Sequence, residues 1–302
     1  MRLRDKLKIY GFADCRSKGL SISQIKWIAL IAMTIDHLAA YGFEIPVFDA
    51  HSNTLRVIGR IAAPLFFFVL TESIRHTRSK PKLLLRLYLG AVGVGLFVTI
   101  TNFLFHDSVG RFRQSNILFD YVYVTLYIIL IEHIIEGIKK KQWKRWLPAC
   151  AGILATSIPH FIALFIYEFP YAKYGLSAET VWTLLDLAGS FVQSPLAAEY
   201  TILFLIMGIL MYFAGNKYGK AAVLVVFSMI CYFGGQVELL KNYSIIGSVL
   251  GHPQYYMILA VPFVLLYNGE KGRGRKYFFY VYYPLHRYLI SVAAFVYKMF
   301  LN

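Results

Sequence analysis

The sequence is poor in charged residues for its length. Of its 302 residues only 16% are charged, whereas 58% are hydrophobic, and a soluble domain carries about 25% charge. The chain is long enough for two soluble domains, but no stretch of it is polar enough to form one. The composition therefore excludes a soluble domain of any size and indicates a protein embedded in lipid.

Cysteine and the common catalytic signatures are equally scarce. The three cysteines (Cys15, Cys150 and Cys231) are far apart and odd in number, which speaks against a disulfide framework and against a CxxC metal site. The sequence contains no HExxH, GxSxG or P-loop motif. We therefore expect no metal cofactor, and nothing in the sequence points to a metalloprotease, a serine hydrolase or a P-loop nucleotidase.

The beginning of the chain is basic and is followed by a long apolar stretch. No A-x-A-like cleavage site follows that stretch, so we expect a retained signal-anchor rather than a cleaved signal peptide. Residues 1–21 are predicted to form a basic cytoplasmic segment in front of the first membrane helix.

Apolar runs of about 20 residues, the length that spans a bilayer as a helix, recur along the whole chain. They predict an all-α, polytopic bundle with about nine transmembrane helices (eight to ten) in a single membrane domain, residues 1–302. The predicted spans are 22–43, 55–74, 84–105, 116–137, 147–168, 196–214, 221–240, 247–267 and 277–300. The stretch 178–195 is too short and too polar to span, and is expected at the membrane surface.

The net charge of +15 is distributed as in membrane proteins. With the N-terminus inside, 22 basic residues, Lys217 and Lys220 among them, flank the predicted helices on the cytoplasmic side, against four on the outer side. Cytoplasmic loops carry such an excess. We therefore predict a multi-pass protein of the plasma (inner) membrane with a cytoplasmic N-terminus and an external C-terminus, and we expect no nucleic-acid partner.

Several ionisable residues fall inside predicted spans, where charge is costly and is usually functional. In the first span, Lys26 and His37 are eleven residues apart, so they share a helix face about 16 Å apart in depth. Asp36 points about 100° away from His37 toward a neighbouring helix. The second span carries Arg60 at a depth similar to His37.

The last span adds His286, near mid-membrane, to these polar residues. Histidine suits proton transfer because its unperturbed pKa lies near neutrality. Together these residues predict a buried acid–base centre made of His37, Asp36, Arg60 and His286. The alternative is a polar knot, a cluster of buried polar side chains that only holds helices together. Glu72, His76 and Arg78 begin a basic loop that is either a topology signal or a binding surface for a phosphorylated cytosolic ligand.

Three segments of the chain resemble the TraX family, named after a conjugative-plasmid protein linked to N-terminal acetylation of pilin. These are Lys26–His37, then Leu55–Phe66 with Glu72 and His76–Arg78 beyond it, and third Asn268–Gly269 with Lys271–Gly272, followed by Tyr280–His286. TraX proteins resemble the wider group of transmembrane acyltransferases, which includes the acyltransferase-3 family. In that group a basic residue and a histidine in the first helix, with ten residues between them, form a hallmark that Lys26 and His37 match.

The resemblance implies an acyltransferase that moves an acetyl group from cytosolic acetyl-CoA to an acceptor at or beyond the outer membrane face. The acceptor would be a peptide amine, a glycan or a lipid head group. His37 would be the general base or the acyl carrier, and Asp36 would orient its ring. Arg60 would hold the thioester or the oxyanion, and His286 would be a second acid–base group. The residues expected to bind acetyl-CoA are Lys26, Glu72, His76 and Arg78.

Two functions from other classes remain open at this point. A transporter or flippase for a small anion or a lipid head group would use the same polar core without covalent chemistry. A structural scaffold would tolerate replacement of the buried histidines and arginines.

The charge distribution generates a test of topology. We expect cysteines introduced at Arg78 and Lys140 to react only with reagents that reach the cytosol, and cysteines at Lys173 and Asn302 to react with reagents confined to the outside. Labelling of position 140 by an impermeant external reagent would show that the predicted orientation is wrong.

Overall fold

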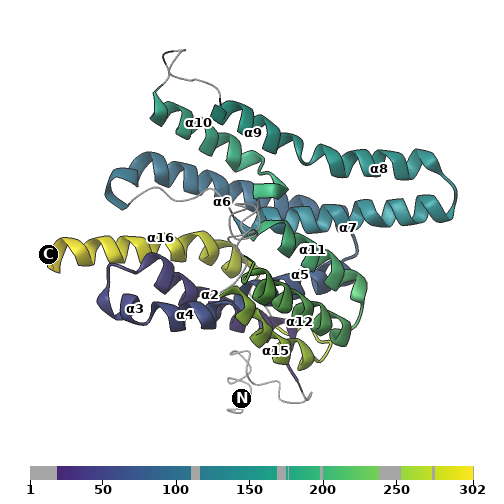
Figure 1. The fold of residues 1–302 in the computed structure, drawn as a ribbon, viewed down its shortest axis with the longest axis horizontal. Coiled ribbons are helices and arrows are strands. Elements are labelled where there is room, and N and C mark those ends of the chain that lie inside the picture. The colour runs from purple at the N-terminus through teal and green to yellow at the C-terminus, as the bar shows by residue number, and fades with distance from the viewer. Residues whose placement is uncertain are drawn as a thin grey trace, which may run out of the picture. The chain divides into compact units, whose positions relative to one another are not determined.

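The computed structural model describes residues 19–109, 116–168, 175, 177–197, 200–237, 253–273 and 276–301 (Figure 1). Within these residues the chain is helical and contains no strand, and a parallel bridge joins Leu20 to Tyr267. The elements are α2 (Ile22–Tyr41), α3 (Pro46–Ala50), α4 (Ser52–Gly59), α5 (Ala62–His76), α6 (Lys80–Val109), α7 (Ile117–Lys139), α8 (Trp143–Ala155), α9 (Ile158–Glu168), α10 (Ala178–Phe191), η2 (Pro195–Ala197), α11 (Thr201–Ala214), α12 (Lys217–Gly234), η3 (Gln254–Ala260), α15 (Val261–Leu265) and α16 (Lys276–Leu301). The predicted all-α class is confirmed.

The helices form two compact units. The first unit contains α2 to α5 as far as Ser73, the end of α11 from Leu210, and α12, η3, α15 and α16. In it α2 packs against α4 and α16, and α12 packs against η3 and α15. The second unit contains α6 to α10, η2 and the beginning of α11. In it α6 packs against α7 and α10, and α7 runs beside α8 (Figure 1).

The predicted count of nine membrane helices is wrong for the described residues. Four helical stretches there are long and apolar enough to cross a membrane, and Ile202–Ala214 and Gln254–Leu265 are shorter apolar helices. The four stretches are Ser52–His76, Lys80–Phe105, Ile117–Lys139 and Lys217–Gly234. The described part of the chain thus fits a membrane protein with fewer full-length apolar spans than the sequence predicts.

Two of the predicted spans contain a break beside a proline. The predicted span 55–74 is divided between α4 and α5 at Arg60 and Ile61, and the predicted span 147–168 is divided between α8 and α9 at Thr156 and Ser157. Pro64 and Pro159 each follow such a break. Proline has no N–H for the carbonyl four residues earlier and its ring clashes with that carbonyl, so the helix is interrupted just before it.

The first and last predicted spans are helical over nearly their predicted lengths. α2 has 20 residues and α16 has 26. They are absent from the four apolar stretches because Lys26, Asp36 and His37 lower the mean hydropathy of α2, as Pro284, His286 and Arg287 do for α16. The polar residues that lower the hydropathy of these two helices include the candidate site residues.

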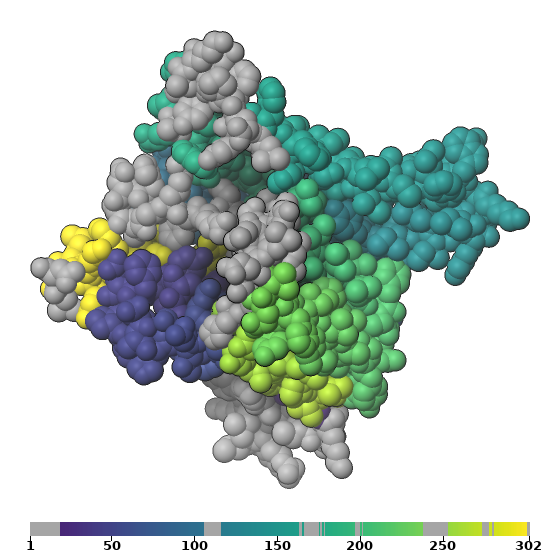
Figure 2. Space-filling view, viewed as in Figure 1, coloured from purple at the N-terminus to yellow at the C-terminus, as the bar shows by residue number. Residues whose placement is uncertain are grey.

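Large apolar side chains cover much of the surface of the first unit. In the space-filling view, α12 (green) and residues 254–265 (yellow-green) form one continuous surface (Figure 2). Exposed hydrophobic side chains on these elements include Val226, Met229, Ile230, Phe233, Leu259 and Leu265. An apolar surface of this extent is unusual on a soluble monomer and suits contact with lipid.

Close packing of α6 on α10 organises the second unit. A Cβ atom on Gly95 would lie 2.6 Å from the Cα of Ser190, whereas a Cβ atom on Gly93 would meet nothing within 4 Å. The Thr99 hydroxyl is 2.8 Å from that of Ser190, and the Asn102 amide donates to Asp186 at 3.1 Å. Gly95 is therefore a helix-packing residue, and Gly93 is not.

Lys220 is not a loop residue, which corrects its place in the predicted topology count. It lies in the first turn of α12, is fully buried, and forms an ion pair with the buried Glu72 of α5. Its ammonium group also donates to the Thr71 hydroxyl at 3.1 Å and lies 5.2 Å from the centre of the Phe68 ring. The ion pair fastens α12 to α5 inside the first unit.

Removing one partner of this buried pair should destabilise the protein strongly. Because Lys220→Ala leaves the Glu72 carboxylate buried without its cation, we expect a loss of about 3–5 kcal/mol, read as a large fall in Tm in detergent. Lys140→Ala, which removes an exposed ion pair with Glu136, is the matched control and should change stability by less than about 1 kcal/mol. Equal Tm values for the two variants would contradict a stabilising role for the pair.

Candidate functional site

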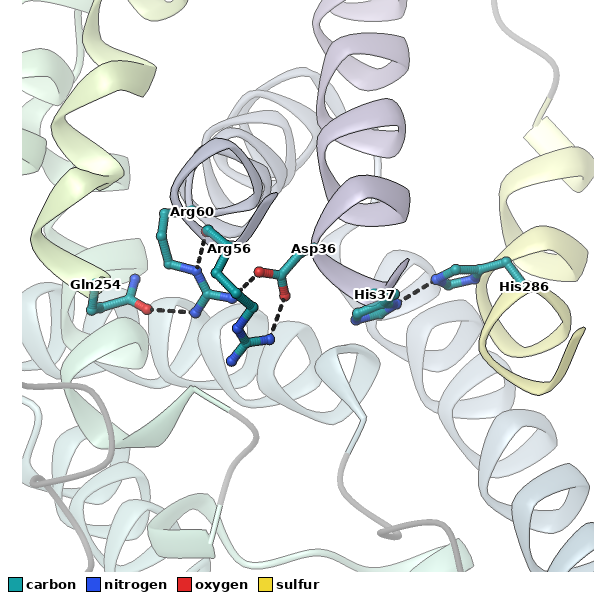
Figure 3. A network of polar contacts seen from close by, with 6 residues as sticks. All are labelled: Asp36, His37, Arg56, Arg60, Gln254 and His286. Carbon is teal, nitrogen blue, oxygen red and sulfur yellow. Dashed lines mark hydrogen bonds and ion pairs between the residues drawn. The ribbon is translucent and has the colours of Figure 1, made fainter. Parts of the chain in front are cut away.

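The candidate site is built on two consecutive residues near the end of α2. Successive helix residues point about 100° apart, so the Asp36 side chain faces α4 while the His37 side chain faces α16 (Figure 3). Both residues are buried, with 7% and 8% of their surface exposed. One turn of α2 therefore supplies a group to each of two separate polar contacts.

His37 pairs with His286 of α16. Nδ1 of His37 lies 2.5 Å from Nε2 of His286, and the two rings are stacked with their centres 4.8 Å apart (Figure 3). His286 is 4% exposed. The structure thus brings together the two histidines that the sequence places 249 residues apart.

The hydrogen bonds of His286 define the tautomers of both neutral rings. Nδ1 of His286 lies 2.8 Å from the carbonyl oxygen of Tyr282, and because a carbonyl only accepts, this Nδ1 carries the proton. Nε2 of His286 is then the acceptor, so Nδ1–H of His37 donates to it. This assignment leaves the lone pair of His37 on Nε2, the nitrogen that can act as a base.

Tyr282 holds the His286 ring in place. Its own ring stacks on that of His286, 5.0 Å between centres and 2° from parallel. The Tyr282 hydroxyl is 2.7 Å from the hydroxyl of Thr34, which donates to the carbonyl of Leu30 at 2.9 Å. Tyr282 therefore donates to Thr34, and this bond connects α16 to α2 one turn before His37.

Asp36 is bound by two arginines from α4 and its C-terminal end. The Arg60 guanidinium forms an ion pair and hydrogen bond with Oδ1, and the Arg56 guanidinium lies 3.2 Å from Oδ2 (Figure 3). Arg60 also donates to the Gln254 side chain at 3.0 Å and to the Arg56 carbonyl at 3.2 Å. A Cβ atom on Gly59 would clash with the Asp36 side chain, so glycine is required for this close approach of α4 to α2.

The contacts of Asp36 and Arg60 differ from those that their expected roles imply. Asp36 was expected to orient the His37 ring, but its carboxylate binds Arg60 and Arg56, and the His37 ring is bonded to His286. Arg60 is held by Asp36, Gln254 and a backbone carbonyl. It adds positive charge near the histidines while its guanidinium is engaged by protein groups.

Arg287 is a site residue that sequence reasoning did not select. It is 6% exposed, and its guanidinium lies 5.1 Å from the ring centre of Tyr41. The Tyr41 ring in turn lies edge-on to His37, with centres 5.3 Å apart. Arg287, Arg56 and Arg60 all act electrostatically on His37, so the ring lies in a positively charged environment. The available signal was the position of Arg287 next to His286 inside a predicted span.

The four residues expected to bind the donor have different surroundings. Lys26 is half-buried in α2, with its ammonium group 6.0 Å from the centre of the Phe279 ring. Glu72 is buried against Lys220. His76 ends α5 and Arg78 follows it, and both are exposed. Of the four, only Lys26 lies on the same helix as His37.

The chain matches a curated relative and a protein-family model over nearly its whole length. A curated relative, the "probable fimbrial assembly protein FimC, serogroup H1" of Dichelobacter nodosus, is 27% identical over 297 residues, which cover 95% of this chain and 99% of the relative. No solved structure matches the chain. The family model described as "TraX protein" matches residues 21–293. This range contains α2, α4 and most of α16, the elements that carry the histidine pair and the Asp36 ion pairs, and the chain belongs to the TraX family.

Proposed function

We propose that this protein is a membrane-embedded acyltransferase that moves an acetyl group from cytosolic acetyl-CoA to an acceptor at or beyond the outer face of the membrane. The observation that supports it best is the buried His37–His286 pair, in which Nε2 of His37 keeps a lone pair. A general base for acyl transfer must be neutral and held in one orientation, and a hydrogen bond to the second ring nitrogen is the usual way to do this.

The proposed reaction follows from this arrangement. The acceptor amine or hydroxyl attacks the thioester carbonyl while Nε2 of His37 takes its proton. The C–S bond then breaks, and the departing thiolate takes the proton from the His37 imidazolium, which gives the acetylated acceptor and free CoA thiol. In the alternative route, Nε2 of His37 attacks the thioester carbonyl and the C–S bond breaks. The Nδ1 proton of His37 passes through Nε2 of His286 to the departing CoA thiolate, which leaves a neutral acyl-imidazole. The acceptor then attacks the acyl carbon, the acyl–Nε2 bond breaks, and the acceptor's proton passes to His37, which returns to its neutral form.

The arginines around the histidines suit the charge that such a reaction develops. Attack on the thioester places negative charge on the carbonyl oxygen, and fixed cations in a site of low dielectric constant stabilise it. Arg287 and Arg60 provide this positive charge near His37. Both guanidinium groups are therefore candidates to stabilise the oxyanion.

The proposal also covers the orientation of the protein in the membrane and the molecule that accepts the acetyl group. The excess of basic residues in the predicted cytoplasmic segments supports a cytoplasmic N-terminus in the inner membrane, so the donor would enter from the cytosol. Of the three acceptors that the sequence leaves open, a peptide amine agrees best with a relative that is named for fimbrial assembly.

A transporter or flippase for a small anion or a lipid head group is the second candidate. The buried Lys220–Glu72 pair favours it, because paired intramembrane charges are typical of transport pathways. The two candidates differ in a measurable way. An acyltransferase releases CoA thiol when it is given an acceptor, whereas a transporter shows counterflow of its substrate and releases no thiol.

His37→Ala tests the chemistry directly. We expect turnover per folded molecule to fall by about 10² to 10⁴, as for loss of a general base, with a folded protein remaining in detergent. The paired measurements are Tm and thiol release from acetyl-CoA with a peptide acceptor, with acetylation of cell-envelope molecules followed by mass spectrometry. His160→Ala, a histidine of the second unit, is the control and should keep full activity. A destabilised His37→Ala variant with normal turnover would end the catalytic assignment.

His286 should act as a positioning residue, and two substitutions distinguish this role from simple packing. His286→Gln places a carbonyl oxygen where Nε2 accepts the bond from His37, so it should retain much more activity than His286→Ala. The rate–pH profile of His286→Ala should also differ from that of the wild type, because His37 then loses the partner that fixes its tautomer. If both variants show equal activity and an unchanged pH profile, His286 does not orient His37.

A further inference from the structure

Residues 266–273, here called the tied segment, run along the beginning of α2. Leu20 N–H donates to the Leu266 carbonyl at 2.7 Å, and Ile22 and Ser23 donate from their N–H groups to the carbonyls of Glu270 and Lys271 at 2.9 and 3.1 Å. The Ser23 hydroxyl donates to the Arg273 carbonyl at 2.5 Å. The backbone of the tied segment is therefore held in one place against the first turn of α2.

Gly272 allows this close approach. Its φ is +67°, in the left-handed region, and a Cβ atom there would lie 2.5 Å from the Ser21 hydroxyl oxygen. A side chain at this position would be strained and would push the segment away from α2. Glycine thus allows the backbone next to Lys271 to lie directly on the helix.

This contact brings lysines from different parts of the chain together. Lys26 follows Ser23 by three residues, so the two share a helix face, and Lys271 is bonded through its carbonyl to Ser23. The Lys271 ammonium lies close enough to repel that of Lys26. Lys217, at the start of α12, donates to the Tyr267 carbonyl within the tied segment at 3.3 Å. Because Tyr267 is bridged to Leu20, the Lys217 ammonium also lies on the part of the tied segment that pairs with the residues just before α2.

The grouping is electrostatically unfavourable without an anion. Lys26 is half-buried, and like charges repel more strongly where solvent is partly excluded. Within the part of the chain that the structure describes, neither Lys26 nor Lys271 forms an ion pair with a carboxylate. The first N–H groups of α2 are already bonded to the tied segment, so an anion would be bound by the lysine side chains.

We propose that Lys26, Lys271 and Lys217 bind phosphate groups, and that in the proposed reaction these are the phosphates of the acyl-CoA donor. The identity of the ligand depends on the proposed function, whereas the phosphate chemistry follows from the lysines. Lys26 and His37 lie about 16 Å apart along one face of α2. The donor then lies along this helix, with its phosphates at the tied segment and its thioester at His37, the two ends being separated by the pantetheine arm.

The proposal keeps Lys26, which the sequence already assigns to the donor, and replaces Glu72, His76 and Arg78 by Lys271 and Lys217. His76 ends α5 and Arg78 lies in the basic loop after it, whereas Lys271 and Lys217 are contributed by the tied segment and by α12. Neutralising substitutions can therefore distinguish the two surfaces.

The test measures CoA binding to the full-length protein in lipid-free detergent. Because charge-assisted hydrogen bonds contribute about 1.5–3 kcal/mol, Lys271→Gln should weaken CoA binding about tenfold or more and reduce its salt dependence. Lys26→Gln should have a similar effect. Binding of pantetheine, which has no nucleotide phosphates, should not change. Lys139→Gln, an exposed lysine of α7, is the matched control and should bind CoA like the wild type.

The outcomes distinguish the proposals from one another. If the wild type does not bind CoA, the acyltransferase proposal fails. If the wild type and Lys271→Gln bind CoA equally while Arg78→Gln binds it weakly, the site at the tied segment is wrong and the acyltransferase remains. If Lys271→Gln binds CoA like the wild type and loses only its binding of short-chain phosphatidylglycerol added in detergent, the lysines bind lipid head groups and the donor assignment is overturned. A Tm measurement for each variant shows that the protein tested is folded.

Discussion

The ion pair between Asp36 and Arg60 is the contact on which the arrangement of the site depends. A carboxylate buried in an apolar helix bundle needs a cation, and here the cation comes from the C-terminal end of α4, which approaches closely because residue 59 is glycine. Since Asp36 holds α2 against α4, the next residue, His37, is turned toward α16. The polar contact that ties the helices together and the pair that can do chemistry are therefore separate but adjacent.

Because these two contacts are separate, the buried polar residues of the protein do not form a single cluster with a single role. The sequence left two interpretations of these polar residues, an acid–base centre and a polar knot, and the structure separates the residues into two contacts, each compatible with one of the interpretations. Asp36, Arg56 and Arg60 form a knot whose charges are largely satisfied by one another. His37 and His286 are held by neutral hydrogen bonds, and His37 keeps a nitrogen that can accept a proton.

Much of the fold could be predicted from the sequence because hydropathy depends on local composition. The all-helical class, the positions of α2, α6, α7 and α16, and the candidate residues His37 and His286 all follow from apolar runs and the polar residues within them. The number of full-length apolar spans could not be predicted in this way. An apolar run does not show that the helix is interrupted before Pro159, nor that polar residues leave α2 and α16 less apolar than the other long helices.

The sequence by itself determined that this chain is apolar, helical and a match to the TraX pattern, and which residue types lie at which depth along each helix. Only the tertiary structure decided which of these residues meet. Lys220 stands beside a predicted span, where a lysine usually flanks the membrane, yet it is buried against Glu72. Arg287 lies against Tyr41, a residue 246 positions away in the chain. Such pairings depend on the rotation of each helix and on which helices are neighbours. Both are set by packing between segments that are distant in the chain, and a local sequence pattern does not determine that packing.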